Sequence, residues 1–342
     1  MLSDCYASEN KATSQRVKSL NTALVNARSQ IPDQAQADGL LQVNADTFTW
    51  YYTQEANRKE GMKLQKAITE AANAKKFDTQ QQSAATPLEK ARLNAFSAQG
   101  AAFPVTTNPS RNTEMKDADV EYFCRMGLGL NPHLNMPQHC HCNKHSGCFA
   151  SDPYHGLNCE KERSSTRYDQ HDALDTTVSR WCAAVGADVT PQEPTRRSLE
   201  EERRDGDKKR PDRLIKIGSK QWLMDFTVRN PLAPSHVADA AADPKRVLQK
   251  AEQEKHRKYD ALAASTNSQL VAFAVESTGR IGEEALRFIK ELIKEAASYK
   301  VVWAPRQVVY GIYREVVMAV VKGNTGVFAS NYRKCQAAAL SG

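Results

Sequence analysis

Residues 210–228 read RPDRLIKIGSKQWLMDFTV, and this stretch predicts a β-hairpin. The two runs 213–217 and 221–228 are short, rich in branched and aromatic side chains, and therefore typical of strands. Gly218-Ser219 lies between them and has the composition of a tight turn. The hairpin is the local feature from which the rest of the fold can be worked out.

Two acidic residues belong to this hairpin. Asp212 enters the first strand and Asp225 lies in the second, with twelve residues between them. Antiparallel strands joined by a tight turn bring such acids together, and adjacent carboxylates hold a hard divalent cation such as Mg²⁺. The alternative is that Asp225 simply faces solvent, because antiparallel sheets often have one solvated face.

A polar helix is expected from Asp243-Pro244 to about residue 264. Within it, Lys255 and Tyr259 are four residues apart and share a face, while Lys258 is one position off. A Lys close to a metal-bound water orients that water and offsets developing phosphate charge. The alternative is a solvated helix face without chemistry.

The flanking segments alternate between helix and strand after residue 165. The sequence predicts helices over 117–126, 169–185, 283–297 and 305–321, and strands over 188–193 and 269–276. Residues 1–95 read as loosely packed helices, one of which begins at Thr86-Pro87. The fold class that these patterns favour is α/β.

A Cys/His cluster precedes this region. Residues 140–159 read CHCNKHSGCFASDPYHGLNC, and thiolates with imidazoles in a short segment suit Zn²⁺ in a closed tetrahedral site. His155 and Cys159 form one usable pair, because residues four apart share a helix face. The other ligands stay open among Cys140, Cys142 and Cys148, and the alternative is a set of thiols without a metal. Four further cysteines stand alone and are expected to be ordinary thiols: Cys5, Cys124, Cys182 and Cys335.

Charge is distributed unevenly along the chain. The formal net charge is +7, and residues 196–260 carry 17 Lys and Arg against 12 Asp and Glu. A polyanion such as nucleic acid is the partner that this suggests, although exposed mixed charge is the alternative. The basic residues expected to contact phosphates are Arg196, Arg197, Lys208, Lys209 and Arg210.

Targeting signals favour an intracellular protein. The first twenty residues lack the apolar region of a secretory signal, and the longest apolar runs are far shorter than the roughly 20 residues of a membrane span. We therefore expect no membrane partner. The basic run 208–210 also has the composition of a nuclear import signal, so nuclear residence is expected.

The order of these features resembles a known family. A Cys/His cluster, a helix, a strand ending in EP, an RPD-x12-D hairpin, a K-x3-Y helix, an apolar strand and ESTGRIG follow one another over residues 117–322. This order is similar to the C-terminal part of the reverse transcriptases of non-LTR retrotransposons that carry a restriction-like endonuclease of the PD-(D/E)xK superfamily. The polymerase of that family, with its paired aspartates in a YxDD strand, has no counterpart in this sequence.

The resemblance implies a fold and a domain plan. A PD-(D/E)xK core, which is a mixed sheet flanked by helices, would follow a zinc knuckle and an α-helical N-terminal region. The implied plan is a helical region at 1–95, a linker with a short helix at 96–135, the zinc knuckle at 136–165, the endonuclease at 166–322 and a tail at 323–342.

The resemblance also implies residue roles. Asp212 and Asp225 would bind Mg²⁺, and Lys255 or Lys258 would replace the Lys of the (D/E)xK strand, where this sequence has Thr227. Tyr259 would support the site, and Glu193 is a candidate for a further carboxylate. The implied zinc ligands are Cys140 or Cys142, Cys148 or its neighbour, His155 and Cys159.

The function that follows is a magnesium-dependent endonuclease that nicks DNA, with element RNA as a further partner. Self-association through the N-terminal helices and a separate polymerase chain are two further expectations about partners. The alternative is a retroelement-derived protein that binds nucleic acid without catalysis.

Overall fold

The computed structural model describes residues 76–102, 104, 113–130, 140, 142, 149, 152, 154–159, 166–191, 211–301 and 304–341. The chain divides into two compact units, Met1–Ala84 and Ala85–Gly342. In the first unit the described residues are 76–84, which are helical as far as Ser83. The sheet and all labelled elements belong to the second unit.

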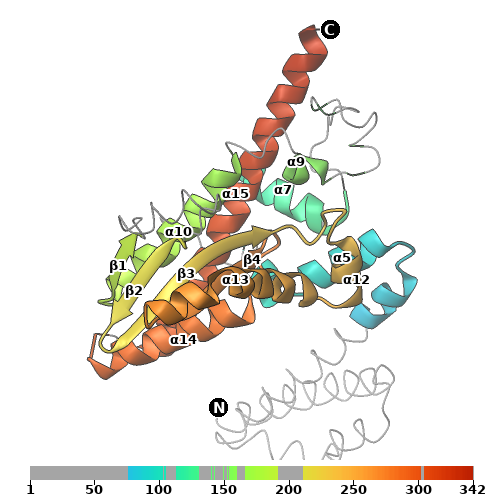
Figure 1. Cartoon of the computed structure of the whole chain (residues 1–342). Coiled ribbons are helices and arrows are strands. Elements are labelled where there is room, and N and C mark those ends of the chain that lie inside the picture. The colour runs from blue at the N-terminus through green and yellow to red at the C-terminus, as the bar shows by residue number, and fades with distance from the viewer. Residues whose placement is uncertain are drawn as a thin grey trace, which may run out of the picture. The chain divides into compact units, whose positions relative to one another are not determined.

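Four strands form one mixed sheet in the order β1-β2-β3-β4 (Figure 1). β1 (Asp188–Pro191), β2 (Arg213–Ile217) and β3 (Lys220–Arg229) run antiparallel, and β4 (Gln269–Glu276) pairs in parallel with β3. The predicted hairpin is thus confirmed. Gly218 in its turn has a φ of +57°, a conformation that favours glycine, and a Cβ there would collide with the Tyr299 hydroxyl.

The side chains of β3 point alternately to the two faces of the sheet. Met224 and Phe226 join the main hydrophobic core, whereas Leu223 packs with Tyr259 on the opposite face. Asp225 alternates with Met224 and Phe226 and therefore lies on the face of Tyr259. Because Asp225 is only 3% exposed, the alternative that it faces solvent is wrong.

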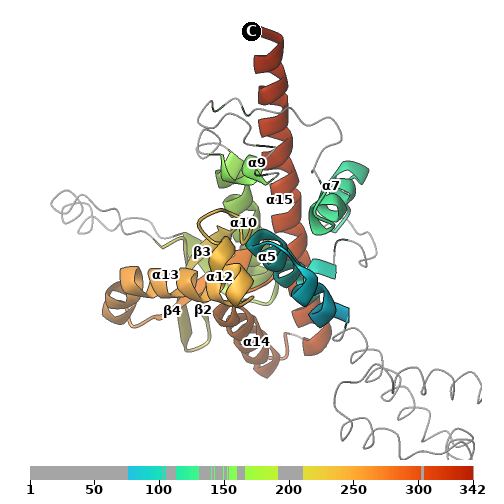
Figure 2. The same ribbon diagram turned by 90° about the vertical axis from the view of Figure 1, so that its right-hand side faces the viewer.

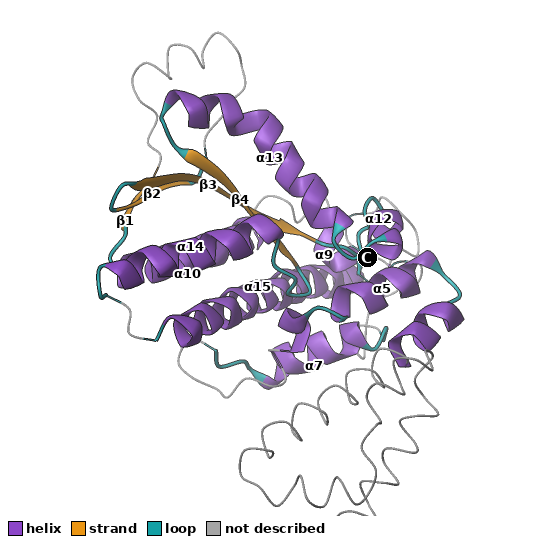
Figure 3. Ribbon diagram, turned by 90° about the horizontal axis from the view of Figure 1, so that it is seen from below, coloured by secondary structure: helices purple, strands orange, loops and turns teal. Residues whose placement is uncertain are grey.

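Helices cover both faces of the sheet (Figure 3). α13 (Arg246–Ser265) lies on one side, and α14 (Glu283–Ser298) packs on the other together with α10 (Thr166–Ala184). Because both faces are covered, β4 is an almost continuous apolar run in which every residue after Gln269 is buried. A mixed sheet flanked by helices is the coarse fold that the sequence predicted.

The last helix is longer than its sequence pattern indicates. α15 runs over Pro305–Ser341, whereas the prediction ended it at Val321 and placed a tail at 323–342 (Figure 2). Gly323 lies within the helix and allows a close approach to α10, because a Cβ there would lie 2.7 Å from the Cγ atom of Gln170. In the part of the chain that the structure describes, no helix has the length and apolar character needed to cross a membrane.

Shorter elements pack around this core. α5 (Pro87–Phe96) begins with the expected cap, in which Thr86 and Glu89 form a reciprocal capping box. α5 packs against α12 (Val237–Ala242), a helix of six residues that is too short for its periodicity to be recognised. Although the sequence grouped α5 with region 1–95, it lies in the unit that begins at Ala85. The remaining elements are η1 (Gln99–Ala102), α7 (Asp117–Gly127) and α9 (His155–Asn158).

Candidate functional site

Asp212 lies at the start of β2, beside the middle of β3. Its backbone N–H donates to the carbonyl oxygen of Met224 over 2.9 Å. Its side-chain Oδ2 accepts a hydrogen bond from the backbone N–H of Phe226 over 2.7 Å. Since Phe226 directly follows Asp225, the hairpin holds the two predicted acids next to each other.

Asp225 receives its main partner from α13. The ammonium of Lys255 lies 2.5 Å from Asp225 Oδ2, and the side chains are 22% and 5% exposed, respectively. The Tyr259 hydroxyl, one helical turn further along α13, also forms a hydrogen bond with this carboxylate. The sheet and the helix therefore bring together four of the predicted residues: Asp212, Asp225, Lys255 and Tyr259.

The electrostatics of Asp225 reflect this arrangement. Burial raises the pKa of Asp225 above its usual value, and the charge of Asp212 adds to the increase. Lys255 and the Tyr259 hydroxyl act in the opposite direction and lower the pKa, because both stabilise the ionised form. Asp225 is thus a buried acid whose charge Lys255 compensates in part.

The structure distinguishes between the two lysines that the sequence left open. Lys255 contacts the acid pair, whereas the ammonium of Lys258 lies over the ring of Tyr259, 4.9 Å from its centroid. Thr227 occupies the strand position two residues after Asp225 and so shares its face. Lys255 from α13 therefore supplies a cation on the face of the sheet to which a lysine at position 227 would point.

Two residues of α10 complete the surroundings, and sequence reasoning missed both. His171 Nε2 lies 3.1 Å from Asp212 Oδ2. This hydrogen bond raises the pKa of His171 to about 9, against the effect of burial. Asp175, four residues later on the same face, forms a two-pronged ion pair with Arg213, with distances of 2.7 to 3.0 Å. The four-residue spacing of these polar side chains on a largely core-facing helix was the available signal.

Several predicted residues lie outside the described residues. They are Cys148, Glu193, Arg196, Arg197, Lys208, Lys209 and Arg210.

A second cluster contains sulfur ligands. The side-chain donor atoms of Cys140, Cys142, His155 and Cys159 all lie within 4.8 Å of one another. Cys140 Sγ and Cys159 Sγ are 3.7 Å apart, and Cys142 Sγ lies 3.4 Å from His155 Nε2. Among the described cysteines no disulfide is present. This Cys₃His set can bind a metal ion such as zinc, and it uses both Cys140 and Cys142, which the sequence treated as alternatives.

Cys335 belongs to the surroundings of this cluster, which corrects the expectation that it stands alone. It is buried with Cys140, Cys142 and Cys159 and comes from α15, far away in the sequence. Asn331 lies one turn earlier on α15. Its Oδ1 atom is 3.3 Å from the Sγ atom of Cys335 and 3.8 Å from the Sγ atom of Cys140. The last helix therefore covers the Cys₃His cluster.

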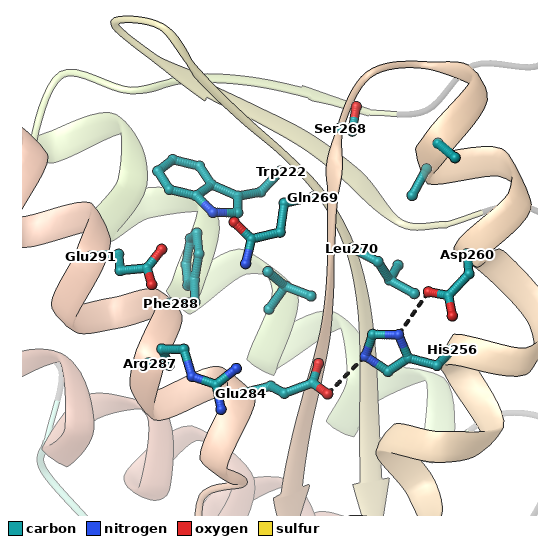
Figure 4. Close-up of a pocket in the computed structure, with 13 residues that line it drawn as sticks. Trp222, His256, Asp260, Ser268, Gln269, Leu270, Glu284, Arg287, Phe288 and Glu291 are labelled. Atoms are coloured by element: carbon teal, nitrogen blue, oxygen red, sulfur yellow. Dashed lines mark hydrogen bonds and ion pairs between the residues drawn. The ribbon is translucent and has the colours of Figure 1, made fainter.

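A pocket of about 400 Å³ lies elsewhere, between α13, α14 and the outer edge of β4 (Figure 4). At its side His256 bridges Asp260 and Glu284 at 2.7 Å each. Glu284 also accepts the N–H of Ala272 in β4 at 3.1 Å, so the charged side chains cover part of an edge strand. Asp212 and Asp225 do not line this pocket.

Comparisons with protein-family models, with curated proteins and with solved structures find no match to this chain.

Proposed function

We propose that this protein is a magnesium-dependent DNA endonuclease that nicks DNA by phosphodiester hydrolysis. The observation that carries the proposal is the meeting of Asp212, Asp225 and Lys255, which come from two strands and a helix. The order of motifs that resembles retrotransposon restriction-like endonucleases supports it, as does the mixed sheet flanked by helices.

The donor set fits Mg²⁺. This ion is commonly held by one or two carboxylates, with waters and substrate phosphates completing its shell. Asp212 and Asp225 supply two neighbouring carboxylates. Burial raises the pKa of Asp225 and the charge of Asp212 adds to this rise, so a cation between the two acids would favour their ionised forms. When bound, Mg²⁺ would supply charge stabilisation and an activated water.

The side chains around the acids have separate roles in this proposal. Lys255 favours the ionised form of Asp225 and would place a positive charge where the negative charge of a scissile phosphate develops. Tyr259 helps to hold the Asp225 carboxylate through a hydrogen bond from its hydroxyl. In hydrolysis the oxygen of a water would form a bond to phosphorus while the bond between phosphorus and the 3′ oxygen breaks. The attacking water would lose one proton to solvent, and the 3′ oxygen would take up one proton and leave as a hydroxyl.

The Cys₃His cluster is assigned to structural zinc. Zn–S distances of about 2.3 Å in a tetrahedron place two sulfurs about 3.8 Å apart, and a Zn–N distance near 2.05 Å places sulfur and nitrogen about 3.6 Å apart. The observed separations are 3.7 Å for the Cys140–Cys159 pair and 3.4 Å for the Cys142–His155 pair. All four protein ligands are thus present, which is the arrangement of a closed structural site rather than a catalytic one.

The proposed partner is DNA, with element RNA as a further nucleic acid and the nucleus as the place of action. This part rests on the basic composition of residues 196–260 and on the family resemblance. A separate polymerase chain would supply reverse transcription.

A second candidate function is nucleic-acid binding without catalysis. The observation that favours it is the closed state of the acid pair, because Asp225 is 3% exposed and its Oδ2 is already paired with Lys255. Under this alternative the nuclease fold acts as a scaffold.

One experiment separates the two functions. Asp212→Ala is compared with wild type for nicking of supercoiled plasmid in Mg²⁺ and for DNA binding over a range of salt concentrations. The endonuclease proposal expects lost nicking with retained binding in the variant. Salt-sensitive binding by the wild type without Mg²⁺-dependent nicking would instead establish the scaffold function.

A further inference from the structure

The carboxylate of Asp212 is held at one oxygen by two separate parts of the fold. Oδ2 accepts the backbone N–H of Phe226 (2.7 Å) from β3 and lies 3.1 Å from Nε2 of His171 in α10. Neither contact uses Oδ1. An oxygen that already accepts two hydrogen bonds is a weak additional donor to a metal, whereas Oδ1 keeps its lone pairs.

His171 is itself fixed by its neighbours. Its ring meets the ring of Phe226 edge-on, with centroids 6.2 Å apart. The preceding residue, Gln170, is 8% exposed and hydrogen-bonds to Asn324 of α15. The position of the imidazole is therefore set by the packing of α10 on the sheet and on α15.

The same helix also binds Arg213, the first residue of β2. Asp175 lies four residues after His171 and pairs with Arg213, which directly follows Asp212. Two neighbouring positions of β2 are thus tied to one face of α10, so α10 determines where the start of β2 lies and how the Asp212 side chain is turned.

We propose that His171 is the positioning residue of the metal site: it holds Oδ2 of Asp212 so that Oδ1 is turned toward a divalent cation shared with Asp225. The inference rests on the proposed function, because it concerns the same acid pair. Residues that orient metal ligands from outside the coordination shell change metal affinity by about 10- to 100-fold when they are removed.

The test measures metal binding directly and does not require cleavage. The full chain is first loaded with zinc, so that the cysteine cluster is occupied, and Mn²⁺ binding is then measured by electron paramagnetic resonance. We expect His171→Ala to weaken Mn²⁺ binding about tenfold. The control is Thr176→Ala, because Thr176 is exposed on another face of the same helix, and this variant is expected to bind like wild type.

Two polar replacements separate positioning from a general structural role. Gln places its side-chain N–H the same number of bonds from the backbone as His Nε2, whereas Asn is one carbon shorter. His171→Gln is therefore expected to keep Mn²⁺ affinity within about threefold of wild type, while His171→Asn is expected to be as weak as His171→Ala. This pair decides the matter even if the Ala variant does not fold.

Variants of the acids distinguish failure of the inference from failure of the proposed function. If Asp212→Asn loses Mn²⁺ binding while His171→Ala and His171→Asn bind like wild type, His171 is not a positioning residue and the metal site stands. If Asp212→Asn and Asp225→Asn both bind Mn²⁺ like wild type, the metal site is wrong and the inference falls with it.

Discussion

Replacing Lys255 by Met is expected to destabilise the fold through the charge that it leaves behind on Asp225. Met preserves most of the length and apolar contact of the side chain, so the main change is the loss of the ammonium. Asp225 is 3% exposed, and its Oδ2 lies 2.5 Å from that ammonium. Without it, a buried carboxylate must remain charged and uncompensated or take up a proton.

The magnitude follows from the burial of the two partners. Breaking a buried ion pair by removing one member costs about 3–5 kcal/mol. Because the Lys255 side chain is 22% exposed and is partly solvated, we expect the lower end, about 3 kcal/mol at pH 8. Burial already raises the pKa of Asp225, and the loss of Lys255 raises it further. Stability that depends on a raised carboxyl pKa is present at low pH and lost as pH rises, so the cost at pH 5 is expected to be smaller.

Urea unfolding at pH 5 and pH 8, followed by circular dichroism without added Mg²⁺, measures this difference. The matched control is Lys258→Met, three residues along the same helix, where the ammonium faces the Tyr259 ring and its loss costs about 0.5–1 kcal/mol. The double variant Asp225→Asn/Lys255→Met is expected to recover most of the stability. Equal losses for both lysine variants at both pH values would refute the reasoning.

Three other perturbations test separate parts of the structure. Cys159→Ser is expected to abolish the binding of one zinc per chain, measured by metal analysis after gel filtration. The control Cys124→Ser is expected to keep this zinc. Stoichiometric zinc in both variants would exclude Cys159 as a ligand. Burial raises the pKa of Glu276 to about 7, so the wild type is expected to lose up to about 3 kcal/mol of unfolding free energy as pH rises from about 4.5 to 7. Glu276→Gln is expected to flatten this pH dependence in urea titrations. The same pH dependence in the variant and the wild type would contradict this expectation. Gly323→Ala is expected to lower the free energy of unfolding by about 1–3 kcal/mol, because the new Cβ would meet Gln170. Gly326→Ala, with open space around its Cβ, is expected to raise it by about 0.5–1 kcal/mol. Similar thermal midpoints for the two variants would contradict the packing role of Gly323.

Local patterns were sufficient to locate the strands and the hairpin, but not the order in which the strands pair. The hairpin of β2 and β3 follows from two strand-like runs around Gly218-Ser219, and β4 matches its apolar run from Gln269 to Glu276. These signals work because each strand is buried in a way that its own residues record. The end of α15 could not be found in the same way, since Gly323 marks a close approach to α10 and not a break.

The candidate site was partly accessible from the sequence. Spacing in the hairpin was enough to place Asp212 beside Asp225, but the choice of Lys255 over Lys258 needed the rotation of α13 on the sheet. His171 could not be assigned, because it reaches Asp212 only through the packing of α10, 41 residues away in the chain.

The cysteine cluster shows the same limit. The local run predicted metal ligands but left Cys140 and Cys142 as alternatives, and the structure uses both. Cys335 joins the cluster through the far end of α15, and no spacing within residues 140–159 indicates that contact.

The most direct test of the central claim is the Mg²⁺-dependent nicking of supercoiled plasmid, followed by treatment of the product with DNA ligase. We expect the wild type to produce nicks that ligase reseals, because hydrolysis leaves a 3′ hydroxyl and a 5′ phosphate, and we expect no nicks with Asp225→Asn or with EDTA. Nicking that persists in Asp225→Asn, or a wild type that folds, holds zinc and binds DNA but never nicks it, would contradict the claim.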